Sequence, residues 1–276
     1  MTDAFENLGE RLRYKALKSE DAERLYSTFP RLGRDPEKFC PTCRTKKFYV
    51  WQDERFECDC QLQLQLNKHY LNAGIGDMYQ RYSWTDLDNP AGEQLKSVAK
   101  AYLDQAEDFV QAGMGIVFLG PWGRGKSLVS NLILKSLLWR ENTVYATTFT
   151  SMIEMFTAGW KSTEDKRHFD QKTKKVGVLL IDDLGKEMTT SINLGGSTFD
   201  DVLRHRVHFA QPTFITSNMS KHELAKGQYG GAIASLISES FHIIDLAYVE
   251  DTFDYRTSAG ERKFQEIANG WTRPII

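Results

Sequence analysis

Short hydrophobic runs alternate with amphipathic stretches along the last two-thirds of the chain. The runs are short and partly β-branched, which is typical of buried parallel strands. We predict strands at 116–119, 143–149, 177–181, 213–217 and 242–247. Hydrophobic residues recur at helical spacing between them, and we predict helices at 95–111, 127–139, 150–158, 197–209 and 231–239. This alternation predicts an α/β fold with a five-stranded parallel sheet and a ligand site at the carboxyl ends of its strands.

The first third of the chain has a different pattern. Residues 1–28 predict a helix with a hydrophobic face made of Phe5, Leu8, Leu12 and Leu17. Residues 74–95 are rich in turn-forming residues, and we interpret them as part of a linker. The organisation we expect is an N-terminal domain (1–70), a linker (71–95) and a larger domain (96–276).

The composition excludes several classes of protein. With 276 residues, 41% hydrophobic and 12% aromatic, the chain has enough apolar residues for a core, which excludes general disorder. The net charge of −2 excludes a polycation, so any contact with nucleic acid needs a local basic patch. No uncharged run is long enough to span a bilayer, and residues 1–15 lack the hydrophobic segment of a secretory signal. We therefore expect a cytoplasmic protein with no membrane partner.

Residues 115–127 match a phosphate-binding loop between a strand and a helix. The sequence GPWGRGKS fits the pattern G-x4-G-K-[ST], in which backbone N–H groups surround phosphate oxygens at a helix N-terminus. Lys126 would reach the β- and γ-phosphates of ATP or ADP, and the Ser127 hydroxyl would bind Mg²⁺. The cofactor-binding residues that we predict here are Gly120, Gly123, Arg124, Gly125, Lys126, Ser127 and Leu128. A chance glycine-rich turn before a helix is the alternative.

Two further strands end in polar residues that fit the same site. The run VGVLLIDDLG (176–185) ends in two carboxylates: Asp182 would bind Mg²⁺, and Asp183 would orient or deprotonate the attacking water. The run PTFITSN (212–218) ends at Asn218, which would contact the γ-phosphate or that water. Alone, an acidic pair is often a helix cap and an asparagine a turn residue.

All four cysteines of the chain lie within 21 residues. Their pattern is C-x2-C-x14-C-x-C, which is typical of four thiolates around a structural zinc ion. Between the two pairs we predict a hairpin, with Phe48 to Trp51, a turn at 52–55, and then Phe56. A redox pair or unrelated buried thiols are the alternatives. The proposed zinc ligands are Cys40, Cys43, Cys58 and Cys60.

Residues 161–175 form the most basic segment of the larger domain. Six Lys and Arg residues occur there, with Trp160 and Phe169 close by. Cations for phosphates and aromatic rings for base stacking are the features of a single-stranded nucleic-acid surface. A solvated helix face is the alternative.

The motifs GPWGRGKS, LLIDDLG and TFITSN, behind a cysteine-rich N-terminus, resemble those of bacterial and phage replicative helicase loaders of the DnaC/DnaI type. These belong to the AAA+ ATPases and to the IstB-like ATP-binding superfamily. The resemblance covers about residues 70–276. It includes the stretch AGIGDMYQRYSWTDLD before the core and the DYR at 254–256.

The resemblance implies an AAA+ P-loop ATPase core with a small N-terminal zinc-ribbon-like domain that binds a hexameric DnaB-type helicase. It also implies ATP between subunits of an oligomer and single-stranded DNA along the inside of a spiral. By motif match, Asp182 and Asp183 are the Walker B pair and Asn218 is sensor 1. Arg206 matches a basic position often seen in the family, so we include it among the catalytic residues.

One segment departs from the family pattern. Ala232 and Leu236 occupy the positions where an arginine finger and a second sensor arginine are expected, in YGGAIASLISES. Because such a finger greatly accelerates hydrolysis, we expect slow turnover unless another residue, such as Arg204, Arg206 or Arg256, replaces it. An IstB-like transposition regulator and an ATP-binding assembly scaffold remain alternatives. A small-molecule kinase fits the strand-end carboxylates and Asn218 less well.

Overall fold

The computed structural model describes residues 48–51, 53–57, 60–87, 90–185, 192–226, 230–246, 255–269 and 275. The chain divides into two compact units. The smaller unit comprises Met1–Asn72, Gly76–Arg81 and Arg273–Ile276, and the larger comprises Ala73–Ile75 and Tyr82–Thr272.

The described residues of the smaller unit form a β-hairpin and two helices. Strands β1 (Phe48–Trp51) and β2 (Glu54–Glu57) pair antiparallel, which confirms the predicted hairpin. The turn is tighter than expected because Trp51 pairs with Glu54 and Asp53 has a φ of 64°, a left-handed conformation that suits a two-residue turn. Helices α4 (Cys60–Asn72) and α5 (Asp77–Gln80) follow.

Three of the four predicted zinc ligands belong to segments that the structure does not describe. Cys40, Cys43 and Cys58 lie outside the described residues, as does the predicted helix at 1–28. Cys60 is the first residue of α4, but its side chain is not described. Within the described part of the chain, no group of three or more His, Cys, Asp or Glu side chains is arranged to hold a metal ion. Zinc binding therefore stays a prediction.

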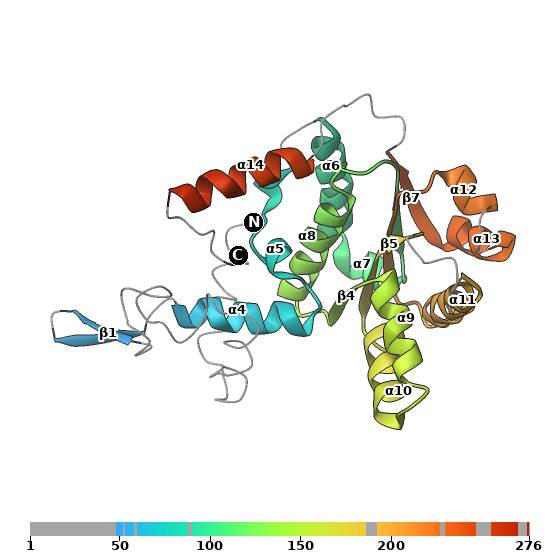
Figure 1. Ribbon diagram of the computed structural model, residues 1–276, viewed down its shortest axis with the longest axis horizontal. Helices are drawn as coiled ribbons and strands as arrows, with labels where there is room; N and C mark the ends of the chain where they lie inside the picture. The colour runs from blue at the N-terminus through green and yellow to red at the C-terminus, as the bar shows by residue number, and fades with distance from the viewer. Residues whose placement is uncertain are drawn as a thin grey trace. The chain divides into compact units, whose positions relative to one another are not determined.

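The larger unit is built on a five-stranded sheet in which all paired strands are parallel, as predicted (Figure 1). The strand order is β4-β5-β6-β3-β7, which places β3 and β5 on either side of β6. All five strands lie within two residues of the predicted starts, and only β5 extends well beyond its predicted end. The strands are β3 (Gly115–Leu119), β4 (Val144–Thr148), β5 (Val178–Leu184), β6 (Thr213–Ser217) and β7 (Phe241–Asp245).

Helices cover both faces of this sheet (Figure 1). Helix α8 packs on one face, against β4, β5 and β6, and α6 packs on α8. On the other face, α9 contacts β4 and β5, and α11 packs against α9. The helices are α6 (Pro90–Asp104), α7 (Ala106–Gln111), α8 (Lys126–Trp139), α9 (Phe149–Ala158), α10 (Thr163–Phe169), the π-helix η3 (Asp170–Lys174), α11 (Ile192–His208), α12 (Lys221–Lys226), α13 (Gly230–Ser240) and α14 (Tyr255–Ala268).

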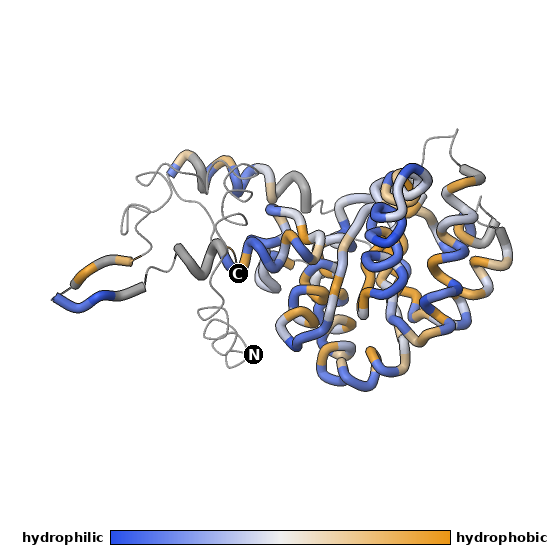
Figure 2. Tube along the Cα trace, turned by 90° about the horizontal axis from the view of Figure 1, so that it is seen from below, coloured by the Kyte–Doolittle hydropathy of each residue, from blue (hydrophilic) through white to orange (hydrophobic). Residues whose placement is uncertain are grey.

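The core of the larger unit follows from the alternation of side chains along the strands. Val117 and Leu119 face a cluster completed by residues of α9, α11 and α13, while on the other face Tyr102 of α6 packs edge-on against Phe214 at 5.2 Å between ring centroids. Helices of this unit alternate hydrophobic and hydrophilic residues along their length (Figure 2). None of the helices in the described ranges is both long and hydrophobic enough to cross a bilayer.

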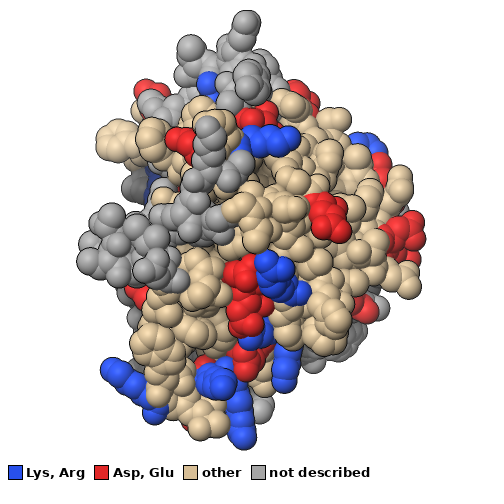
Figure 3. Space-filling model, turned by 90° about the vertical axis from the view of Figure 1, so that its right-hand side faces the viewer, with Lys and Arg blue, Asp and Glu red and all other residues tan. Residues whose placement is uncertain are grey.

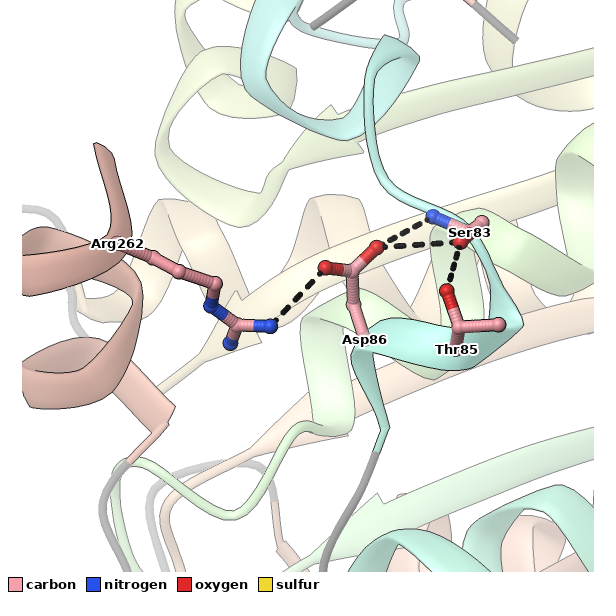
Figure 4. Close-up of polar contacts among 4 residues, drawn as sticks. All are labelled: Ser83, Thr85, Asp86 and Arg262. Carbon is pink, nitrogen blue, oxygen red and sulfur yellow. Dashed lines mark hydrogen bonds and ion pairs between the residues drawn. The ribbon is translucent and has the colours of Figure 1, made fainter. Parts of the chain in front are cut away.

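Residues 82–86, which precede the core, contact helices α8 and α14. In the 3-10 helix η2 (Trp84–Asp86), the buried Asp86 carboxylate accepts hydrogen bonds from the Ser83 backbone N–H (2.8 Å) and hydroxyl (3.2 Å), and pairs with Arg262 of α14 (3.4 Å; Figure 4). Lys135 of α8 donates to the Tyr82 carbonyl oxygen at 2.8 Å. Burial lowers the pKa of Lys135 to about 7, and Asp86 opposes this shift. These contacts fix the helix that begins at the phosphate loop.

Candidate nucleotide-binding site

The loop between β3 and α8 has the backbone of a phosphate-binding loop. Gly120, Gly123 and Gly125 have φ values of 123°, 72° and 84°, conformations that residues with a Cβ rarely adopt. Gly125 is the N-cap of α8, and no side chain caps the helix there. The first N–H groups of the helix are therefore not covered by a capping side chain, and an anion at this end is favoured by the helix dipole.

Lys126 connects this loop to the end of β6. Its Nζ donates to the carbonyl oxygens of Gly120 and Pro121, both at 2.7 Å, and to Asn218 Oδ1 at 3.0 Å. The residue is only 6% exposed, so the ammonium lies within the loop. Sequence analysis placed Lys126 and Asn218 at one site, and the structure brings them together across 92 residues of sequence.

Ser127 and Asp182 also meet, although they come from different strand–helix units. The Ser127 hydroxyl donates to Asp182 Oδ1 at 2.7 Å. A hydroxyl and a carboxylate at this distance are the hard oxygen ligands that Mg²⁺ prefers, and neighbouring positions would be filled by water or phosphate. The two residues therefore fit the predicted role of holding Mg²⁺.

The end of β5 is bulged beside β6. Ile181 pairs with Ile215 and Leu184 pairs with Ser217, so Asp182 and Asp183 together lie opposite Thr216. Asp183 has a φ of 61°, a left-handed conformation that Asp and Asn tolerate better than most residues. Bulges redirect side chains near sites of chemistry, and this one presents two consecutive carboxylates at the same edge of the sheet.

The remaining predicted loop residues have distinct surroundings. Arg124 is half-buried, and its Nη1 atom is buried without a hydrogen-bond partner in the described structure. The Leu128 side chain is 9% exposed and packs inward, so only its backbone is suited to meet a nucleotide. Trp122, in contrast, is 65% exposed.

Arg206 is not brought to this site. Its side chain is fully buried and donates five hydrogen bonds, with donor–acceptor distances of 2.7–3.0 Å, near the amino ends of β5 and β6. The phosphate loop lies at the opposite edge, where the parallel strands end. The five acceptors are Thr213 Oγ1 and the carbonyl oxygens of Thr173, Val176, Gly177 and Pro212. Burial lowers the pKa of Arg206 to about 9, which leaves the guanidinium charged at neutral pH. The geometry therefore fits a structural role.

Replacing Arg206 with leucine should destabilise the protein by about 3–5 kcal/mol, because buried acceptors lose their donor. Urea unfolding monitored by fluorescence measures this loss. Arg204→Ala is the matched control, since Arg204 pairs with Asp200 on the exposed side of α11, and we expect little change in the free energy of unfolding there. A loss for Arg206→Leu no larger than that of the control would contradict a structural role.

The two positions that lack the expected arginines lie on α13. Ala232 is exposed, and Leu236 packs against the hydrophobic cluster of the larger unit. Neither supplies a cation near the phosphate loop.

The basic segment contains all of α10 and η3, and α10 packs against α9 in a helical hairpin; Lys161, Lys166 and Arg167 of the segment are exposed. Trp160 is 66% exposed at the turn. Phe169 is only 2% exposed and packs against Phe156, so the expectation that it could stack on a base is wrong. Figure 3 shows the face of the molecule that lies on the right in Figure 1. Lys and Arg side chains gather at the lower end of this face, and α10 also lies at the lower end in Figure 1.

The parallel five-stranded sheet and its phosphate loop define an α/β fold of the AAA+ class, as predicted. No protein-family model matches the chain. Over 186 residues it is 30% identical to the replicative helicase loader DnaI of Bacillus subtilis (strain 168), and this match covers 62% of the chain and 56% of that protein. The chain thus spans little more than half the length of the curated relative that it matches.

A helicase loader and a replication initiator are among the solved structures with a similar fold. The DnaC helicase loader superposes with a TM-score of 0.53 at 19% identity, over 62% of this chain and 99% of that chain. The replication initiator DnaA bound to AMPPCP and single-stranded DNA superposes with a TM-score of 0.51 at 15% identity, over 68% of this chain and 55% of that chain. The resemblance to DnaC/DnaI-type helicase loaders that the motifs indicated is therefore confirmed.

Proposed function

We propose that this chain is an ATP-dependent loader of a hexameric, DnaB-type replicative helicase. The observation that carries the proposal is that two hydrogen-bonded pairs, Lys126 with Asn218 and Ser127 with Asp182, lie at one edge of the sheet. The similarity to DnaI and to the fold of DnaC supports the loader role over other uses of this loop. The similar fold of DnaA, whose structure contains AMPPCP, supports the binding of a nucleotide by this chain.

Each residue of the site would have its own role in ATP hydrolysis. The loop N–H groups and Lys126 would hold the phosphates, which requires the Nζ of Lys126 to leave the carbonyl oxygens that it now contacts. Ser127 and Asp182 would hold Mg²⁺, which neutralises charge on the phosphates. Asp183 would accept a proton from the attacking water, and Asn218 would orient that water or the γ-phosphate.

Turnover is expected to be slow. An arginine finger increases turnover by a factor of about 10³–10⁵ in related phosphate-transfer sites, and neither Ala232 nor Leu236 can supply it. The same observation favours a second candidate function, an assembly scaffold that binds ATP and scarcely hydrolyses it. Bound Mg²⁺–ATP without measurable phosphate release, with DNA and helicase present, would support that scaffold.

The loader proposal is tested by mixing the purified chain with replicative helicase from the same host, with and without ATP, and measuring the mass of the complex. We expect a complex that keeps the helicase hexameric and carries several copies of this chain. No complex in either condition, together with ATP-dependent binding of double-stranded DNA by the chain alone, would instead support an IstB-like transposition regulator.

Zinc binding belongs to the same proposal. The β1–β2 hairpin lies between the two cysteine pairs, as expected for a zinc-ribbon-like domain that grips the helicase. We expect about one zinc ion per chain by metal analysis. Cys40→Ser should release it and abolish helicase binding while leaving ATP binding unchanged, and Lys126→Ala is the reciprocal control. A metal-free chain that binds helicase normally would contradict this part of the proposal.

The α9–α10 hairpin is the surface that we propose for single-stranded DNA. Exposed Lys166 and Arg167 would contact phosphates, and Trp160 would stack on a base. Lys166→Glu with Arg167→Glu should weaken binding of a labelled oligonucleotide about tenfold or more at low salt. The control reverses two exposed lysines elsewhere on the larger unit, Lys221 and Lys263. Equal losses in both double variants would reduce the effect to net charge and contradict a specific surface.

A further inference from the structure

Three consecutive residues at the end of β6 each contact a different part of the candidate site. Asn218 accepts a hydrogen bond from Lys126, and Ser217 donates to the Leu184 carbonyl oxygen at 2.7 Å. Thr216 precedes these two residues in β6. It contacts Asp182 and Asp183, the two residues of β5 that carry carboxylates. Sequence analysis assigned a role only to Asn218, because Thr216 lies within a hydrophobic run that predicts a strand.

The Thr216 hydroxyl is used twice. It donates a hydrogen bond to Asp182 Oδ1, the same oxygen that accepts from Ser127. It also accepts a hydrogen bond from the Asp183 backbone N–H, with 3.0 Å between nitrogen and oxygen. Thr216 is 1% exposed, so solvent cannot replace either contact.

This hydroxyl sits opposite the β5 bulge. Two residues of β5 face the single residue Thr216, and Asp183 holds a φ of 61° there. A bulge leaves a residue out of the regular ladder, so its backbone N–H needs another acceptor. Thr216 supplies that acceptor, and through its own proton it fixes the orientation of the Asp182 carboxylate.

We propose that Thr216 is a positioning residue for the Mg²⁺–ATP site, which acts through Asp182 and Asp183 without touching the nucleotide. The inference rests on the proposed function. If the Ser127 oxygen held Mg²⁺, Asp182 Oδ1 would still accept the bond from Thr216, which would keep the carboxylate oriented. A carboxylate held in advance loses less freedom when it binds the ion than one that must be ordered during binding.

The test compares Thr216→Val, which has the same shape without the hydroxyl, with Thr216→Ser, which keeps it. ATP-analogue affinity is measured by calorimetry in EDTA and again in Mg²⁺, and phosphate release is followed under single-turnover conditions. We expect Thr216→Val to bind the analogue in EDTA like wild type. Its affinity gain from Mg²⁺ and its rate of phosphate release should each fall about tenfold or more. Thr216→Ser should restore both.

The outcomes separate the two proposals. A wild-type chain whose ATP affinity does not respond to Mg²⁺ would overturn both the proposed function and the role of Thr216. A wild-type chain that responds, with Thr216→Val responding equally, would overturn only the role of Thr216. If Thr216→Val does not fold, as judged by circular dichroism, Thr216→Ala takes its place because it places no methyl group against the Asp182 carboxylate. Equal losses in the serine and valine variants would indicate a packing role and contradict the proposal.

Discussion

Lys126→Ala should abolish specific nucleotide binding. The Nζ of Lys126 is the cation held inside the phosphate loop, within 3.0 Å of three oxygen acceptors at the site. Its loss removes the charge that would face the β- and γ-phosphates, and we expect the dissociation constant to rise about 100-fold or more. Titration with a fluorescent ATP analogue measures the change.

Lys100→Ala is the control for this prediction. Lys100 is exposed on α6 and pairs there with Asp104 on the surface. The Lys100→Ala variant should bind the ATP analogue with wild-type affinity. A Lys126→Ala affinity within about threefold of the wild-type value would exclude the loop as the phosphate site.

Asp183→Asn should separate binding from hydrolysis. Asparagine tolerates the left-handed conformation that position 183 adopts, so the bulge is preserved while the negative charge is lost. We expect nucleotide affinity within a few-fold of wild type and phosphate release lower by about 10²–10⁴ because the general base is missing. Single-turnover phosphate release and analogue titration together give the two values.

The control for Asp183 is Asp200→Asn, which removes a carboxylate from the exposed side of α11, where it pairs with Arg204. The Asp200→Asn variant should release phosphate at the wild-type rate. Unchanged release in Asp183→Asn would instead assign proton acceptance to another group and leave Asp183 with a backbone role in the bulge.

The strands and the phosphate loop could be predicted because their signals are local. Each buried strand is a continuous hydrophobic run, and the loop has a fixed order of glycines before Lys126. The meeting of Lys126 with Asn218 and of Ser127 with Asp182 followed from one rule, that the carboxyl ends of parallel strands lie at one edge of a sheet.

What sequence reasoning missed depends on contacts between distant residues. Helices α10, α12 and α14 are rich in charged residues and contain few hydrophobic ones. Arg206 was assigned from family resemblance, and only the fold reveals the five acceptors around it. Thr216 was overlooked because a threonine inside a β-branched run looks like an ordinary strand residue, and the bulge that uses its hydroxyl has no sequence signature.

The most direct test of the account is a crystal structure of the full chain with a non-hydrolysable ATP analogue and Mg²⁺. We predict phosphates within the Gly120–Ser127 loop and Lys126 Nζ moved from the carbonyl oxygens of Gly120 and Pro121 to a phosphate. We also predict Mg²⁺ beside Ser127 and Asp182, with the bond from Thr216 to Asp182 kept. A nucleotide bound elsewhere, or a loop that keeps all three Lys126 contacts while the analogue is bound, would contradict the account.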